Sequence, residues 1–279
     1  MARLILYREM RATGLLVWLA VVCCAVAPGA QLTAAAEEDF NKYIKEVETE
    51  LAARVRGQKQ FLWVEEAGSR EVTLRREGVI VEPFAHSGDI SIRNGLIHDW
   101  RGAAFIPNAT ATQVVKVVTD YANHSKTYSP EVVESKILDH LGPKYHVFLR
   151  LKKKKVLTAV LNTEHRAEYR SVNAMRWYGI SRSTRIQEVD NVGSADESTK
   201  PVGQDSGFLW KLNVYWRFEQ VAGGTIAECR AVSLTRDVPM GLGWMIRPIV
   251  RSLPRESLEN TLKATRGAVM DRVTSGTTL

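Results

Sequence analysis

Alternation of apolar and polar residues is the strongest pattern in the C-terminal half of the chain. Between Phe208 and Phe218 every second residue is apolar, and most of the residues between them are polar. Such a period of two predicts an antiparallel strand with one buried face. Ala222-Gly223-Gly224 predicts a hairpin turn, and the return strand from Thr225 to Thr235 has small residues on one face. We expect these small residues either to admit a closely packed helix or to leave room for a ligand.

A change to helical spacing predicts one long helix near the end of the chain. The stretch from Arg247 to Val273 predicts a turn followed by this helix, with Pro254 in the first helical turn, where its missing N–H costs nothing. Leu258, Leu262 and Thr265 recur at helical spacing and form a narrow stripe. Because one helix covers little of a long sheet, we expect a strongly curved sheet that grips the helix and leaves a cavity between them.

Shorter elements are predicted in the N-terminal half. Glu38 to Arg56 has the spacing of a helix, Leu96 to Ile106 predicts a strand, and capping residues from Asn108 onward predict the start of another helix. Short strand candidates are Phe61–Trp63, Val72–Leu74 and Val79–Val81. We divide the chain into a signal peptide (1–36), an N-terminal extension of one helix and short strands (37–95), a main domain (96–273) and a tail (274–279). Whether the extension packs on the main domain stays open.

The order of these elements, together with three short segments, resembles a known superfamily. The segments are Asn108-Ala109-Thr110, Tyr128-Ser129-Pro130-Glu131-Val132-Val133-Glu134-Ser135, and Pro254-Arg255-Glu256-Ser257-Leu258. From Leu96 to Val269 the chain resembles the START-like superfamily, also called polyketide cyclase-like or SRPBCC. The resemblance implies an α+β helix-grip fold, in which a curved antiparallel sheet wraps around a long C-terminal helix and encloses an internal cavity for hydrophobic ligands. Many members bind lipids, sterols or polyketides and some are enzymes, but they share no catalytic set that could be carried over.

The N-terminus has the features of a secretory leader. Three arginines within the first eleven residues precede an apolar run from Gly14 to Ala27, which is short for a membrane span. Cleavage after Ala36 would satisfy the A-x-A pattern of signal peptidase sites, and cleavage near Ala30 is the less regular choice. We expect export, to the periplasm. The alternative is a protein anchored in the membrane through an uncleaved N-terminal segment.

Charge and motif content narrow the functional classes. The chain has 38 Lys and Arg against 31 Asp and Glu, a net charge of +7, and three of the positive charges lie in the leader. The mature part is therefore only mildly basic, and we expect no nucleic-acid partner. There is no Walker loop and no G-x-S-x-G elbow, and the six histidines lack zinc-site spacing. We expect no metal, no cofactor and no locally encoded catalytic residue, although residues that converge only in three dimensions are not excluded.

A candidate ligand site combines the alternating strands with the terminal helix. The predicted pocket lining is Trp210, Leu212, Val214, Trp216, Cys229, Ala231, Leu258, Leu262 and Thr265. Glu164, Arg185 and Arg236 are candidate polar groups that would fix a ligand's head inside the pocket. The alternative interpretation is that these charges form cross-strand salt bridges on a solvated face. The run Lys152–Lys155 is either a solvated strand edge or a contact to the anionic headgroups of an envelope membrane surface.

Three classes of function are compatible with these patterns. The first is an exported protein that binds a hydrophobic or lipid-like small molecule between sheet and helix, as a carrier or sensor without catalysis. The second is a cyclase- or hydrolase-type enzyme on the same fold that uses a carboxylate in the cavity. The third is a structural or interaction module with a filled core. The identity of the ligand and the oligomeric state stay open.

Overall fold

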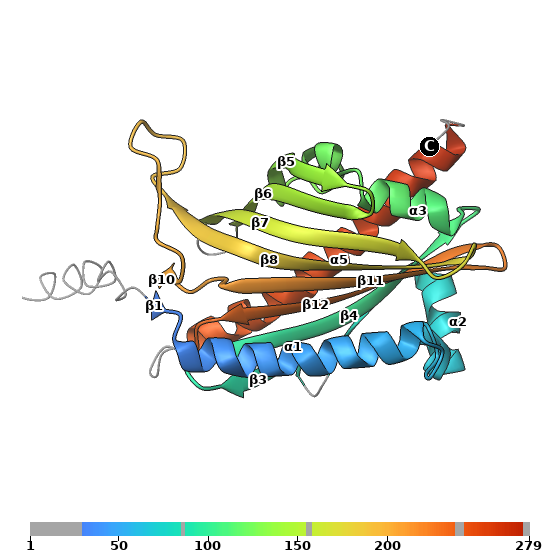
Figure 1. Ribbon diagram of the computed structural model, residues 1–279, viewed down its shortest axis with the longest axis horizontal. Helices are drawn as coiled ribbons and strands as arrows, with labels where there is room; N and C mark the ends of the chain where they lie inside the picture. Colours follow the sequence, from blue (N-terminus) through green and yellow to red (C-terminus); the bar gives the residue numbers. More distant parts are fainter. Residues whose placement is uncertain (1–29, 85–86, 155–157, 238–242, 276–279) are drawn as a thin grey trace, which may run out of the picture.

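One long antiparallel sheet organises the chain (Figure 1). The computed structural model describes residues 30–84, 87–154, 158–237 and 243–275. The strands follow the order β2-β4-β12-β11-β8-β7-β6-β5, and β3 also pairs with β4. Their bounds are β2 (Val79–Pro83), β3 (Asp89–Ile92), β4 (Gly95–Pro107), β5 (Val132–Leu141), β6 (Lys144–Lys154), β7 (Thr158–Ser171), β8 (Arg176–Asp190), β11 (Lys211–Val221) and β12 (Gly224–Thr235). Two-residue strands add short pairings: β1 (Ala30–Gln31) with β10 (Gln204–Asp205), and β9 (Ser198–Thr199) with β8.

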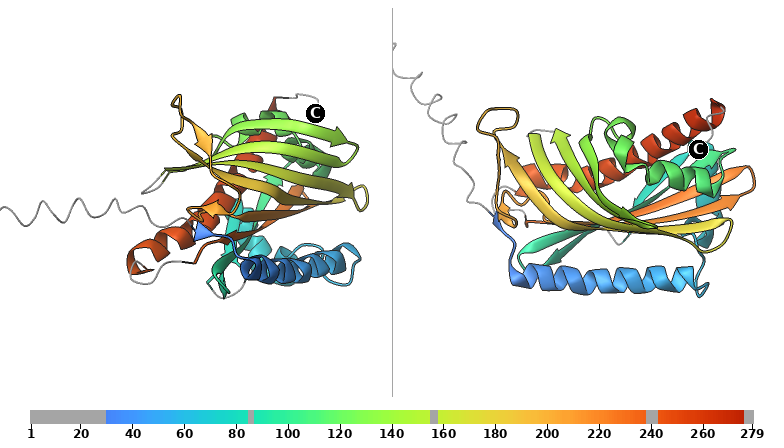
Figure 2. Two further views of the ribbon diagram at one scale, coloured as in Figure 1. Left: turned by 60° about the vertical axis from the view of Figure 1, so that its left-hand side comes forward. Right: turned by 45° about the horizontal axis from the view of Figure 1, so that its top comes forward.

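Helices cover both faces of this sheet. The terminal helix α5 (Gly243–Thr274) crosses one face, here called the inner face, and among the strands it packs chiefly against β4, β2 and β12. Helices α3 (Ala111–Val118) and α4 (His124–Thr127), with the short η3 (Tyr121–Asn123) between them, lie on the same side. Helix α1 (Ala34–Val55) crosses the opposite, outer face, followed by η2 (Val64–Glu66) and α2 (Gly68–Glu77). The right-hand view of Figure 2 shows α1 and α5 on opposite sides of the curved sheet.

The predicted fold class is confirmed. A long curved antiparallel sheet packs against one long C-terminal helix, which is the α+β helix-grip fold. The hairpin of β11 and β12 pairs in full register from Lys211↔Leu234 to Val221↔Gly224. Gly223 adopts a positive φ of 82° in its turn, a conformation that glycine reaches without a steric penalty. The α3 helix begins with a capping box, since Thr110 and Gln113 each bond the other's backbone N–H.

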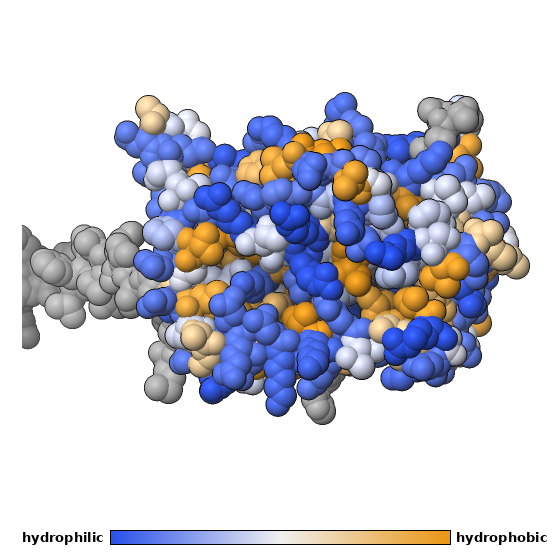
Figure 3. Space-filling model, viewed as in Figure 1, coloured by the Kyte–Doolittle hydropathy of each residue, from blue (hydrophilic) through white to orange (hydrophobic). Residues whose placement is uncertain are grey.

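The hairpin is buried on both of its faces, whereas the sequence predicted only one buried face. A main hydrophobic cluster fills the inner side, and two further clusters lie between the outer face and α1, η2 and α2. Alternate residues that looked solvent-facing in sequence, such as Arg217 and Glu219, are therefore buried. The reason is that α1, η2 and α2 cover the outer face, which the pattern of the strands by itself does not show. Figure 3 shows this side of the molecule, where hydrophobic side chains form separated patches among hydrophilic ones.

Three local predictions are wrong. Phe61–Trp63 forms a bend leading into η2 and not a strand, and Val72–Leu74 lies within α2. Both are short apolar runs, and such runs do not distinguish strand from helix. Pro254 lies inside α5 and not in its first turn, because the helix begins at Gly243.

The segment predicted to be an extension is part of the same sheet. Strands β2 and β3 both pair with β4, and α1 packs on the outer face. Thr33 caps α1 through a hydrogen bond from the Ala36 N–H, and Ala36 is fully buried. Cleavage after Ala36 would therefore remove the cap and the first turn of α1. Most of the predicted leader, up to residue 29, lies outside the described residues. Among the described residues, no helix has the length and apolar character needed to cross a bilayer.

Candidate functional site

The inner face brings together most of the predicted pocket residues. Pairing places Trp216 beside Cys229, and Cys229 beside Gly102 of the neighbouring strand β4. Because successive side chains of a strand alternate between faces, Leu212, Val214 and Trp216 share one face of β11. Trp216 and Cys229 lie in one buried cluster with Leu258 and Leu262 of α5, and Val214 packs against that cluster. The hypothesis that these strands face the terminal helix therefore has a structural basis.

Close packing holds α5 to the sheet at Gly102. A Cβ atom at this position would lie 2.6 Å from Leu262 Cδ1, 2.7 Å from the Ile80 carbonyl oxygen and 2.9 Å from Val81 Cγ2. Such distances are shorter than van der Waals contact, so only glycine fits without movement of its neighbours. The small residues on this face of β12 thus allow a helix to pack closely near Cys229. Close helix packing is one of the two roles that the sequence suggested for these small residues.

Further along the same strands the inner face is less completely covered. Leu212, Val214 and Ala231 are half-buried, whereas Trp216 and Cys229 are buried. Ala231 pairs with both Val214 and Trp100, so these positions form one row across three strands. The Trp100 indole N–H is buried and has no hydrogen-bond partner among the described residues. This row combines apolar walls with one unsatisfied donor, a combination typical of small-molecule sites.

Polar groups are buried on the inner face as well. Thr265 of α5 lies 3.1 Å from the Tyr128 hydroxyl, and the hydroxyls of Tyr121 and Tyr169 are 3.1 Å apart. Burial raises the pKa of Tyr128 to about 12 and keeps its phenol neutral. His165 is fully enclosed, and this burial lowers its imidazole pKa to about 4. These groups are therefore uncharged hydrogen-bonding partners near neutral pH.

The thiol of Cys229 is not activated. Burial raises its pKa, so the thiol stays protonated and behaves as a small apolar side chain.

Trp210 is the predicted lining residue that lies on the wrong side. It immediately precedes β11 and packs with α1 residues such as Phe40 in a cluster on the outer side. Its indole N–H donates to Asp205 Oδ1 at 3.0 Å. The alternation from Trp210 to Leu212 breaks because Trp210 stands outside the pleated strand. The inference from every-second-residue spacing is therefore wrong for this residue.

The three predicted polar groups do not line the inner face. Glu164 carries an ion pair to His146 at 3.1 Å and a longer one to Arg185 at 3.5 Å. It alternates with Thr163 and His165, which face inward, so Glu164 and its partners lie on the outer face. Arg236 follows the end of β12 and lies against Gly207, with its Nη1 3.4 Å from the Ser206 carbonyl oxygen. The salt-bridge interpretation holds for Glu164 and Arg185.

The basic run divides between the two faces of β6. Lys152 and Lys154 are exposed, whereas Lys153 pairs with Glu131, and Lys155 lies outside the described residues.

Several inner-face residues were not predicted from the sequence, among them Trp100, Tyr128 and His165. Trp100 lies in the predicted strand Leu96–Ile106, but the register that turns it toward Ala231 comes from pairing between distant strands. Alternation within Leu96–Ile106 could have placed Trp100 on one face of its strand. It could not have shown which face α5 covers.

Comparison with known proteins shows a similarity of fold, without a match to a family or to a curated protein. No protein-family model matches the chain, and no curated protein does. Among solved structures, TTHA0849 from Thermus thermophilus is 17% identical with a TM-score of 0.44, covering 64% of this chain and 98% of its own. The Zhui aromatase/cyclase from Streptomyces is 14% identical with a TM-score of 0.46, covering 66% and 99%. A STAR-related lipid transfer protein fragment from Xanthomonas axonopodis is 17% identical with a TM-score of 0.45, covering 69% and 98%. At these identities the likeness concerns the helix-grip fold alone.

Proposed function

We propose that this protein binds a hydrophobic or lipid-like small molecule between the inner face of its sheet and α5, as a carrier or sensor. The observation that carries the proposal is the row formed by Val214, Ala231 and Trp100. Two of its side chains are half-buried and apolar, and the third holds a buried N–H without a partner among the described residues. A ligand that covers this row would gain about 25 cal/mol per Å² of buried apolar area. A polar atom on the ligand would also satisfy the Trp100 indole.

The enzyme alternative loses its main candidate. It required a carboxylate inside the cavity, and Glu164 lies on the outer face with His146 and Arg185. Burial holds several described inner-face groups in their uncharged forms, among them the tyrosines, His124, His165 and Cys229. We therefore propose binding rather than catalysis for this face.

Export is a second part of the proposal. A mature chain that begins near Ala30 would keep strand β1, the Thr33 cap and the first turn of α1. We therefore favour this cleavage position over the one after Ala36. N-terminal sequencing of the protein recovered from the periplasm tests the position, and an intact leader in the membrane fraction would support the anchored alternative.

Native mass spectrometry of the purified protein tests the binding site. We expect an adduct of lipid-like mass, released into organic solvent, on the wild type. Ala231→Trp would fill the row and abolish the adduct. Ala222→Trp, in the exposed turn of the same hairpin, is the matched control and should keep it. The binding proposal fails if no adduct forms and no lipid in a titrated panel binds, or if Ala231→Trp binds as well as the control.

A further inference from the structure

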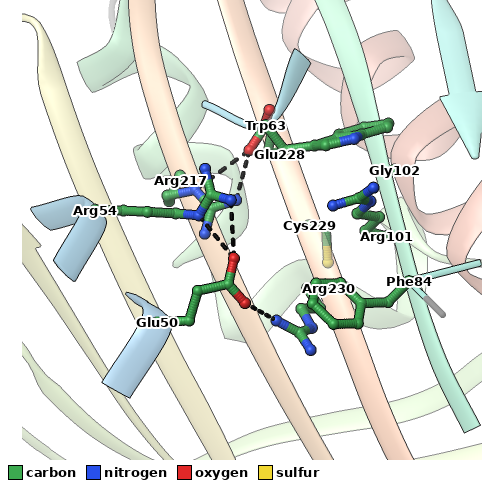
Figure 4. Close-up of a pocket in the computed structure, with 10 residues that line it drawn as sticks. All are labelled: Glu50, Arg54, Trp63, Phe84, Arg101, Gly102, Arg217, Glu228, Cys229 and Arg230. Atoms are coloured by element: carbon green, nitrogen blue, oxygen red, sulfur yellow. Dashed lines mark hydrogen bonds and ion pairs between the residues drawn. The ribbon is translucent and has the colours of Figure 1, made fainter. Parts of the chain in front are cut away.

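A cleft lies on the outer face, on the opposite side of the sheet from α5. It has a volume of about 430 Å³ and lies between α1 and the segment that carries Phe84. A narrower recess of about 10 Å³ adjoins it and shares Glu50, Arg54, Phe84, Arg101 and Arg230 with its lining. Figure 4 shows these side chains converging with Trp63, Arg217 and Glu228 from α1, the bend before η2, the residue after β2 and three strands. The cleft has the size of small-molecule sites.

Ion pairs occupy most of the charged groups around the cleft. Arg54 bonds Glu50 and Glu66, and Arg230 binds Asp99 through two of its nitrogens and Glu50 through the third. These pairs tie α1 to β4 and β12. They use every guanidinium nitrogen of Arg230, so this residue has a structural role.

Two other arginines keep donor groups available. Arg217 binds Glu228 through Nε and Nη2, and Arg101 binds Glu82 through Nε and Nη2. Among the described residues, no acceptor bonds Nη1 of either arginine. Each Nη1 group carries two N–H donors on a permanently charged guanidinium.

A third donor is the indole of Trp63. This side chain is 1% exposed and lines the recess, and its Nε1 has no hydrogen-bond partner in the described part of the chain. A buried donor without an acceptor is unfavourable, so an oxygen atom placed here would gain a hydrogen bond. Arg101 lies over the face of the same ring, 4.7 Å from its centre. The indole and a guanidinium are therefore held together at one end of the recess.

The sizes and linings of the recess and the cleft indicate what kind of ligand would fit both. A recess of this volume holds one atom of the size of a water oxygen. The wider cleft has an aromatic or apolar wall from Tyr43, Val47 and Phe84. An anionic oxygen in the recess and an apolar body in the cleft would match both parts.

We propose that this cleft binds a small amphipathic anion, with a carboxylate or phosphate at Trp63, Arg101 and Arg217 and its apolar part against Phe84 and Val47. This site does not depend on the ligand proposed for the inner face. A neutral molecule of the same shape would make no charge-assisted hydrogen bond to the Nη1 groups of Arg101 and Arg217, so the site discriminates by charge as well as by shape.

Isothermal titration calorimetry with sodium octanoate, octyl phosphate and octanol tests the proposal on the whole chain. The two anions are expected to bind, each at least tenfold more tightly than octanol, and the tighter of the two identifies the head group. Trp63→Phe removes the indole N–H and keeps the aromatic ring, and Arg101→Gln removes the charge. Each should weaken anion binding about tenfold or more, the usual effect of losing a hydrogen bond to a charged group. Arg170→Gln, an exposed arginine paired with Glu168, is the matched control and should change nothing.

Two measurements separate this site from the inner face and from misfolding. Ala231→Trp should leave anion binding at the cleft unchanged. The Trp63 indole resonance, identified by its loss in Trp63→Phe, should shift when octanoate is added to the wild type. If the Phe variant does not fold, Arg101→Gln and the difference between octanoate and octanol carry the test. Equal affinity for octanol and octanoate, unchanged affinity in Arg101→Gln, or an unmoved indole resonance would each overturn the proposal.

Discussion

Packing of α5 on Gly102 leads to a double-mutant prediction. Leu262 is fully buried, and its Cδ1 occupies the space that a side chain at Gly102 would need. Leu262→Ala alone leaves a cavity and is expected to lower the free energy of unfolding by about 2–5 kcal/mol. Gly102→Ala alone forces atoms into contact at 2.6–2.9 Å and is expected to cost about 1–3 kcal/mol.

Combining the two changes should cost less than the sum. In the Leu262→Ala background, the new Cβ at position 102 enters the space that Cδ1 has left, and Val81 Cγ2 can turn away. The Ile80 carbonyl oxygen is backbone and stays 2.7 Å from the new Cβ, so the rescue is incomplete. We expect a coupling free energy of about 1 kcal/mol, within the usual range for residues in contact.

Equilibrium urea unfolding of the four proteins, followed by tryptophan fluorescence, measures this coupling. Gly267→Ala is the control within α5, because its Cβ would meet no atom within 4 Å. It should stabilise the protein by about 0.5–1 kcal/mol through the greater helix propensity of alanine. Strictly additive costs for the Gly102 and Leu262 changes would show that α5 does not lie on β4 as described.

Three other predictions concern pH and single contacts. Burial lowers the pKa of His165 to about 4, below its ordinary value of 6.5, so the folded state binds this proton less readily than the unfolded state does. Its contribution therefore lowers stability as the pH falls from about 6.5 to 4, by roughly 3 kcal/mol at the acid end. His165→Gln should reduce the change of unfolding free energy with pH, measured by urea unfolding, between about pH 6.5 and 4. An unchanged pH dependence would contradict a lowered pKa for His165. Trp210→Phe removes a hydrogen bond to Asp205 on the outer side. It should lower the free energy of unfolding by about 1–2 kcal/mol without changing ligand binding beside α5. Loss of that binding would show that Trp210 does line the ligand site. Thr110→Ala removes the cap of α3 and should lower stability by about 1 kcal/mol in thermal unfolding, whereas Thr110→Ser should retain most of it.

Local periodicity was sufficient for several elements. The hairpin of β11 and β12 and the apolar stripe of α5 follow from side-chain spacing, because the direction of a side chain within a strand or helix is set by the local backbone. The same reasoning placed Trp216, Cys229, Leu258 and Leu262 together before any contact was known, and they share one buried cluster. It failed at Trp210, one residue before its strand begins.

Only the tertiary structure determines which helices pack on each face of the sheet. A strand pattern distinguishes two faces but does not say which side a distant helix will cover. Glu164 and Arg185 lie on the outer face for this reason, and Arg217 and Glu219 are buried because α1 and the segment around η2, both far away in sequence, lie on the side that looked solvated. Neither the unsatisfied Trp63 indole nor the arginine cleft beside it has a local sequence signature. Both arise where side chains separated by more than a hundred residues converge, and such long-range pairings are set by packing of the whole chain rather than by spacing along it.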